Sequence, residues 1–150
     1  MPTWILVADS VRARIFSADS PTGGINEITT LANPEGRLHE QDLVSDRPGR
    51  SFDSRGHGRS GMATQVSAKE HENIRFASRV AEHLESNRKQ GSYRKLIVVA
   101  APEFLGQLSL RLTETTLATI VLRVNKNLAH LNVQEIRAHL PEKMWSSLPA

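Results

Sequence analysis

The sequence predicts an α/β protein in which a mixed five-stranded sheet carries helices on both faces. The first third of the chain holds short alternating or β-branched runs separated by tight polar turns, which is typical of an antiparallel meander. An uninterrupted apolar run at residues 95–101 indicates a strand buried on both faces. Helical segments stand before and after that run, which predicts right-handed crossovers onto the same sheet.

The chain is expected to form one domain over residues 1–150. At 150 residues and 39% hydrophobic content it is long enough to bury a core, and its 23% charged residues do not indicate disorder. Cysteine is absent, so a disulfide framework and a thiolate metal site are excluded. The apolar run Trp4 to Ala8 is interrupted by Asp9, and no run approaches the roughly 20 apolar residues of a membrane span. These features predict a cytoplasmic protein without membrane insertion.

The meander is predicted from three runs around two turns. TWILVA is apolar and β-branched, RARIFSA alternates, and Asp9-Ser10 between them is a turn signal that predicts a β-hairpin. A second turn at Pro21 to Gly24 leads to the run INEITTLA. We expect the first three strands to be antiparallel and the fourth to be parallel to the first. The five predicted strands are residues 3–8, 12–18, 25–32, 95–101 and 119–124.

Three helices are predicted. Ser67-Ala-Lys-Glu70 matches the capping box, so a long helix is expected from Ser67 to about Lys89, with Gly91 as its stop. Pro102 suits a first helical turn and predicts a helix over residues 103–112. The last helix is expected from Asn132, as its cap, through residue 140.

Several kinds of catalytic chemistry find no support in the sequence. Asp9 and Glu103 follow two predicted strands, but two carboxylates are too few for the two-metal site of a ribonuclease H-like enzyme, and a turn and a first-turn helix acid explain them better. The six histidines show no ligand spacing, and neither a P-loop nor a nucleophile elbow is present. We therefore predict no catalytic residue, no metal and no cofactor.

A long loop is predicted over residues 36–65, between the third strand and the long helix, and loops of this length are usually functional or disordered. Within it, Ser45 to Met62 contains four arginines and four glycines and has a net charge of +2, most of the net +3 of the chain. Arginine suits phosphate, Phe52 suits stacking on a base, and glycine allows close backbone approach to an anion. A solvated, inert insertion is the alternative. The candidate RNA- or anion-binding residues are Arg47, Gly49, Arg50, Ser51, Phe52, Asp53, Gly56, Gly58 and Arg59.

Five stretches together resemble the bacterial host attachment family, "protein required for attachment to host cells". They are WILVADSVRARIF, SDRPGRSFDS, KEHENIRFASRVAEHLE, VVAAPEFLGQL and NKNLAHLNVQEIRAHL. The family in turn resembles the central domain of archaeal and eukaryotic peptide-chain release factors. This implies a ribonuclease H-like sheet without nuclease residues, the spatial strand order 3-2-1-4-5, and a glycine-rich loop between the third strand and a long helix.

The resemblance implies a module that associates with RNA or the ribosome, with ribosomal RNA or a tRNA end as the partner. The Gly-Gly-Gln tip of release factors is missing, and the nearest glutamine to the helix start is Gln65. A non-enzymatic role is therefore expected, and an attachment phenotype would be indirect. Two alternatives stay open. One is an interaction module whose loop binds an acidic partner or another subunit in a homo-oligomer, and the other is a weak ester or phosphodiester hydrolase.

Overall fold

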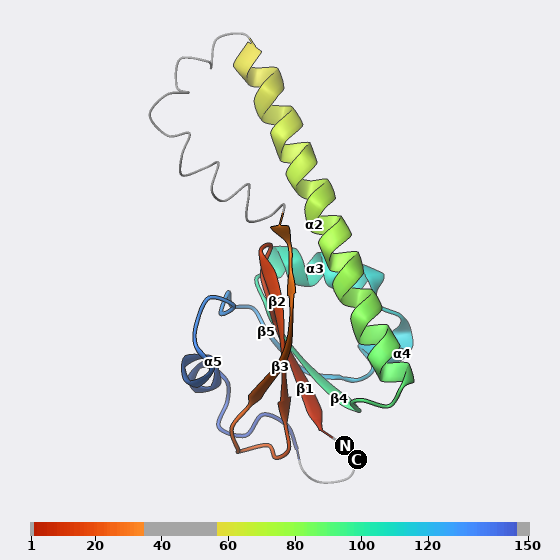
Figure 1. Ribbon diagram of the computed structural model, residues 1–150, viewed down its shortest axis with the longest axis vertical. Coiled ribbons are helices and arrows are strands. Elements are labelled where there is room, and N and C mark those ends of the chain that lie inside the picture. Colours follow the sequence, from red (N-terminus) through yellow and green to blue (C-terminus); the bar gives the residue numbers. More distant parts are fainter. Residues whose placement is uncertain (1, 35–56, 147–150) are drawn as a thin grey trace.

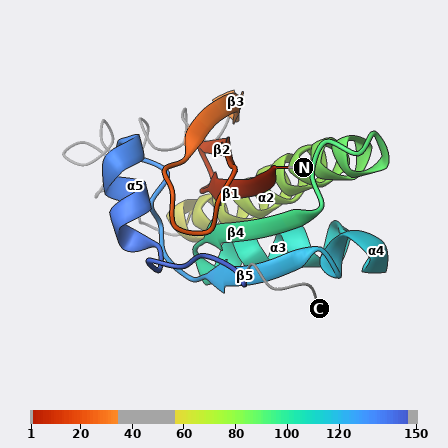
Figure 2. The same ribbon diagram turned by 90° about the horizontal axis from the view of Figure 1, so that it is seen from below.

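The computed structural model describes residues 2–34 and 57–146 of the chain, and within 57–69 only the helical backbone. Its centre is a five-stranded sheet with the spatial order β3-β2-β1-β4-β5, which Figure 2 shows from β3 at one edge to β5 at the other. β1 is antiparallel to β2 and parallel to β4, and β2 is antiparallel to β3. The predicted strand order, strand directions and internal position of the fourth strand are confirmed.

Each predicted strand is present, and its ends lie within one residue of the prediction. The apolar run of β4 lies between β1 and β5, as its lack of alternation indicates. The strands are β1 (Thr3–Ala8), β2 (Arg12–Ala18), β3 (Asn26–Ala32), β4 (Lys95–Ala100) and β5 (Ile120–Val124). The helices are α2 (His57–Lys89), α3 (Pro102–Arg111), α4 (Glu114–Leu117) and α5 (Val133–His139).

Helices cover both faces of the sheet, as predicted, and each face has its own core. Figure 1 shows α2 on one side of the sheet and α5 on the other. Alternate residues of β1 point to opposite sides, so that Leu6 packs with α2 and α3, and Ile5 packs with α5. The α5 helix has the predicted capping box, because Asn132 Oδ1 accepts from Glu135 N at 2.8 Å and Asn132 N donates to Glu135 Oε1 at 3.2 Å.

The long helix α2 begins at His57, ten residues before the predicted start at Ser67. The prediction of a capping box at Ser67 and Glu70 is therefore wrong. A capping box needs the free backbone N–H groups of a first helical turn, and Ser67 lies in the third turn of α2. The predicted loop is likewise wrong over residues 57–65, which are helical; residues 35–56 lie outside the described part of the chain.

The C-terminal end of α2 is set by Gly91, as predicted. Gly91 has φ = 79°, the left-handed conformation that glycine adopts without a Cβ clash. Its N–H donates to Arg88 O at 3.0 Å, and Ser92 N donates to Asn87 O at 2.9 Å. These two bonds form a Schellman motif, which satisfies the last carbonyls of α2 and turns the chain into β4.

The short helix α4, which the sequence analysis did not predict, is joined to α2 through Glu85. Glu85 Oε1 accepts from the backbone N of Thr113 at 2.9 Å and from its hydroxyl at 2.8 Å, and Arg88 Nη2 donates to Glu85 Oε2 at 3.3 Å. Arg88 Nε also donates to the hydroxyl of Thr116 at 2.8 Å. Burial raises the pKa of Glu85, but hydrogen bonds from Thr116, Thr113 and Arg88 outweigh it and lower the pKa from 4.5 to about 2.

Candidate functional site

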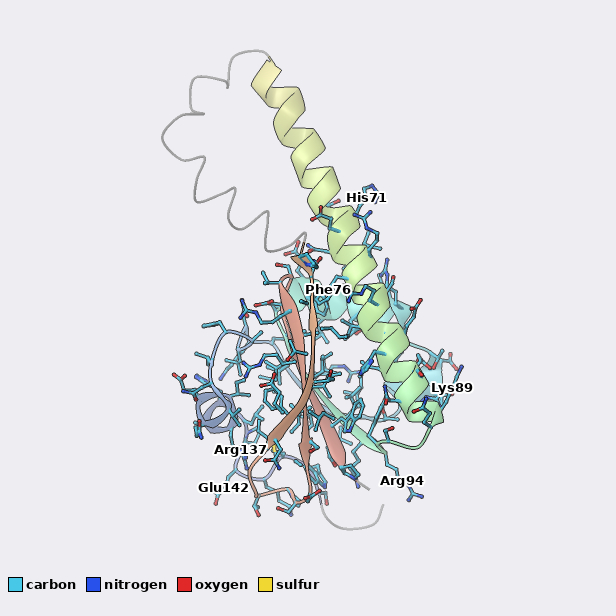
Figure 3. All side chains as sticks on the ribbon, viewed as in Figure 1. His71, Phe76, Lys89, Arg94, Arg137 and Glu142 are labelled. Atoms are coloured by element: carbon cyan, nitrogen blue, oxygen red, sulfur yellow. The ribbon has the colours of Figure 1, made fainter. Side chains whose placement is uncertain are left out.

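Helix α2 divides into a part that packs on the sheet and a part that extends beyond it. Among the residues of α2 whose side chains the structure describes, the buried ones lie between Phe76 and Leu84. Figure 3 shows Phe76 where the helix meets the body and His71 further out along the helix. Beyond His71 the helix continues away from the sheet to His57, and we call residues 57–69 the arm (Figure 1).

The predicted site residues fall mostly outside the described residues. Arg47, Gly49, Arg50, Ser51, Phe52, Asp53 and Gly56 lie within residues 35–56. Gly58 and Arg59 were predicted as loop residues, but they lie in the helical backbone of the arm. The structure therefore places two of the nine candidate residues on α2, at the end far from the sheet.

The junction between β3 and α2 is fixed by side-chain hydrogen bonds. Arg79 Nη1 donates to the carbonyl of Ala32, the last residue of β3, at 3.1 Å, and its guanidinium lies 5.6 Å from the centroid of the Phe76 ring. The buried Asn33 donates from Nδ2 to Ser10 O at 2.7 Å and from its backbone N to Val11 O at 2.8 Å. The end of β3 is thus held against both α2 and the β1–β2 turn.

The turn after β1 is also held rigidly. Asp9 Oδ1 accepts from the backbone N of Val11 at 2.8 Å and of Arg12 at 2.9 Å, and Asp9 N donates to Arg12 O at 2.9 Å. This confirms the prediction that Asp9-Ser10 forms a hairpin turn. Because Oδ1 carries both turn bonds, Oδ2 of Asp9 remains for other contacts.

A pocket of about 280 Å³ lies at the edge of the sheet where β1 and β4 end. Three carboxylates line it: Asp9 after β1, Glu103 in the first turn of α3, and Glu70 on α2. Three carboxamides line it as well, from Asn73 on α2, Gln107 on α3 and Asn127 after β5. The apolar part of the lining includes Ile74 and Phe104, and the ring of Phe104 lies 5.9 Å from that of Phe76.

The sequence analysis considered Asp9 and Glu103 together as a possible two-metal site, but it did not predict this pocket or the place of Glu70 in it. The available signal was their position, because polar residues that directly follow parallel strands meet at one edge of a sheet. Glu70 had been assigned to a helix cap, and the strand directions alone did not show that α2 would bring it there. Among the residues that the structure describes, no group of three or more His, Asp or Glu side chains is arranged to hold a metal ion.

The described histidines are not gathered in one place. His83 stacks on Trp4 with ring centroids 6.1 Å apart, and Trp4 stacks in turn on Tyr93 at 4.9 Å. The Tyr93 hydroxyl donates to Leu84 O at 2.7 Å, and burial raises the pKa of Tyr93 to about 12. These rings join the C-terminal half of α2 to β1, which is a structural role.

A comparison with known protein families shows to which family the chain belongs. Residues 4–140 match the family described as "Protein required for attachment to host cells". The chain belongs to this family. The match covers all the described strands and helices except Thr3, the first residue of β1. No curated protein matches the chain. In the described part of the chain, no helix combines the length and apolarity that crossing a membrane requires.

Proposed function

We propose that this member of the host attachment family is a non-enzymatic module that binds structured RNA, with ribosomal RNA or the end of a ribosome-bound tRNA as its target. The binding residues would be the basic and aromatic side chains of Ser45 to Met62. The observation that carries the proposal is the arm: α2 extends beyond the sheet (Figure 1), and in the sequence the Arg- and Gly-rich segment runs into the first residues of this helix.

The geometry of the arm suits insertion into a larger partner. α2 has 33 residues, which corresponds to roughly 50 Å at the α-helical rise. Its inner half is anchored by buried residues from Phe76 to Leu84, and Arg79 holds its base to the end of β3. A rigid base with a projecting helix would carry the basic segment to a site away from the body of the protein.

The charge distribution supports the same segment. From Glu70 to Lys89, the inner part of α2 carries four acidic and four basic residues apart from histidine, so it has no cationic surplus. Ser45 to Met62 contributes +2 of the net charge of +3. Arginine forks bind phosphates bidentately, and an aromatic ring such as Phe52 stacks on any base, so this segment has the composition that a structured RNA would recognise.

The strand order and the long helix after the third strand also support the likeness to the central domain of release factors, and with it a ribonuclease H-like fold. That domain places a glycine-rich loop at the same point of the element order. This chain has no Gly-Gly-Gln tip, and Gln65 lies in the helical arm. We therefore propose that the protein associates with RNA but does not hydrolyse peptidyl-tRNA. Its place of action would be the cytoplasm, and an attachment phenotype would follow indirectly, through expression of surface components.

Replacement of Arg47, Arg50 and Arg59 by alanine tests the proposal. If each contacts one phosphate, the variant should bind structured RNA more weakly, and the plot of log affinity against log salt should flatten by roughly one unit per lost contact. Replacement of Phe52 by alanine should cost about 1–3 kcal/mol of binding if it stacks on a base. Fluorescence anisotropy with labelled RNA at several salt concentrations gives both quantities.

In the matched control, three other basic residues that are exposed are replaced by alanine, which removes the same charge: Arg94, Arg123 and Lys126. This triple variant should keep the salt slope of the wild type. Equal losses in the two triple variants would contradict a specific role for the segment. If the Arg47, Arg50 and Arg59 variant binds RNA normally but loses self-association, the segment is a protein-interaction site instead.

A further inference from the structure

The pocket at the carboxyl edge of the sheet has a described lining that contains no residue of the arm or of Ser45 to Met62. It is formed by the turn after β1, the start of α3, the segment after β5 and the inner part of α2. In α/β sheets, ligands commonly bind outside the carboxyl ends of the strands, where successive connections leave a crevice. Its volume of about 280 Å³ lies near the lower end of the range for ligand sites, which favours a small molecule.

The lining restricts the charge of that molecule. Asp9, Glu70 and Glu103 are carboxylates, and none of the described residues that line the pocket is a lysine, arginine or histidine. An anion such as a phosphate would be repelled, so the pocket is not a second contact for the RNA backbone. A ligand with a positive charge and several N–H donors would instead meet acceptors from three different segments of the chain.

The apolar part of the lining restricts the ligand further. Ile74, Ala101 and Phe104 lie among the polar groups, and Phe104 is largely buried, so its exposed edge would contact methylene groups. The carboxamides of Asn73, Gln107 and Asn127 offer additional oxygens to N–H donors. Carboxylates beside a short apolar surface match a short aliphatic chain that carries ammonium groups.

We propose that this pocket binds a small aliphatic amine, with its ammonium groups on the carboxylates of Glu70 and Glu103 and its methylene chain on Ile74 and Phe104. Asp9 contributes its Oδ2, because its other carboxylate oxygen, Oδ1, accepts from the backbone N of Val11 and of Arg12. The rigid turn and the buried Phe104 hold two sides of the site in place before the ligand arrives, which lowers the ordering cost of binding.

Three ligands of equal chain length test the charge requirement by isothermal titration calorimetry at low ionic strength. Putrescine carries an ammonium at each end, butanediol a hydroxyl and succinate a carboxylate. Putrescine should bind, and the other two should give no measurable heat of binding. The proposal is overturned if putrescine does not bind, if butanediol or succinate binds as tightly, or if Mg²⁺ binds and displaces putrescine.

Three variants locate the site. Glu70→Gln and Glu103→Gln keep the side-chain shape and should each weaken putrescine binding about tenfold or more, the effect of losing a charge-assisted hydrogen bond. Glu114→Gln is the matched control, because Glu114 is exposed and, like Glu103, stands in the first turn of a helix. It should bind as the wild type does. Equal weakening in Glu114→Gln would mean that putrescine responds to overall charge, and the pocket would be excluded.

The proposal of an amine site and the proposal of an RNA site can be tested independently. The variant in which Arg47, Arg50 and Arg59 are replaced by alanine should bind putrescine with unchanged affinity, because it keeps the carboxylates and apolar residues that the proposed contacts use. Thermal unfolding of each variant checks that its fold is intact before binding is compared. Unchanged melting together with unchanged putrescine binding in both Glu70→Gln and Glu103→Gln would overturn the assignment of the site.

Discussion

Replacing Leu108 by alanine is expected to lower the free energy of unfolding by about 2–5 kcal/mol. Leu108 on α3 is 0% exposed and belongs to the core that α2, α3 and the sheet share. Its truncation removes buried methyl groups and leaves a cavity that the packed helices can close only in part. Urea unfolding followed by circular dichroism measures the change through the midpoint of the transition.

Leu110 offers the matched control for the same substitution on the same helix. Its side chain is 79% exposed, so Leu110→Ala should change the free energy of unfolding by less than about 0.5 kcal/mol. A loss close to that of Leu108→Ala would contradict the packing of α3 described above. It would mean that Leu110 is covered in solution, for example by another subunit.

Replacing Glu85 by glutamine is expected to cost on the order of 1–3 kcal/mol at neutral pH. The Glu85 side chain is 15% exposed, and its hydrogen bonds join the end of α2 to the start of α4. Its folded pKa of about 2 lies below the ordinary value of 4.5, so the fold favours the charged carboxylate. The stabilisation is therefore complete above about pH 4.5 and is lost as the pH falls towards 2.

Urea midpoints measured from neutral pH down to pH values near 2 test this assignment. The wild type should lose stability over the lower part of that range, and Glu85→Gln should show a flatter dependence because it has no proton to take up. Glu82→Gln is the control, since Glu82 is exposed on the same helix. A pH dependence in Glu85→Gln that matches the wild type would show that other carboxylates cause the acid sensitivity.

The sheet was predictable because its signals are local and mutually consistent. The run KLIVVA has no polar face, so it fits only between two other strands and under two layers of helices. Asp9 accepts from the two backbone N–H groups that a hairpin turn presents, and its sequence position after an apolar run was sufficient to predict that turn. Asn132 and Glu135 likewise form the capping box that their spacing indicates.

The start of α2 and the pocket were not predictable in the same way. Ser67 and Glu70 have the spacing of a capping box, but that spacing also occurs inside helices, and the glycines at 58 and 61 disfavour the helix that extends through them. Glu70 reaches the pocket because α2 crosses the carboxyl edge of β1 and β4, which depends on the packing of Phe76 and Leu84 in the core. Such long-range placement leaves no local pattern in the sequence.

Sedimentation of the protein with ribosomes from cell lysate, at low and at high salt, tests the proposed function most directly. The wild type should sediment with ribosomes at low salt and be released at high salt, because phosphate contacts depend on counterion release. The variant with alanine at positions 47, 50 and 59 should stay in the supernatant at both salt concentrations. The control variant with alanine at positions 94, 123 and 126 should behave as the wild type. A wild-type protein that remains in the supernatant at low salt would contradict the proposal of a ribosome-associated module.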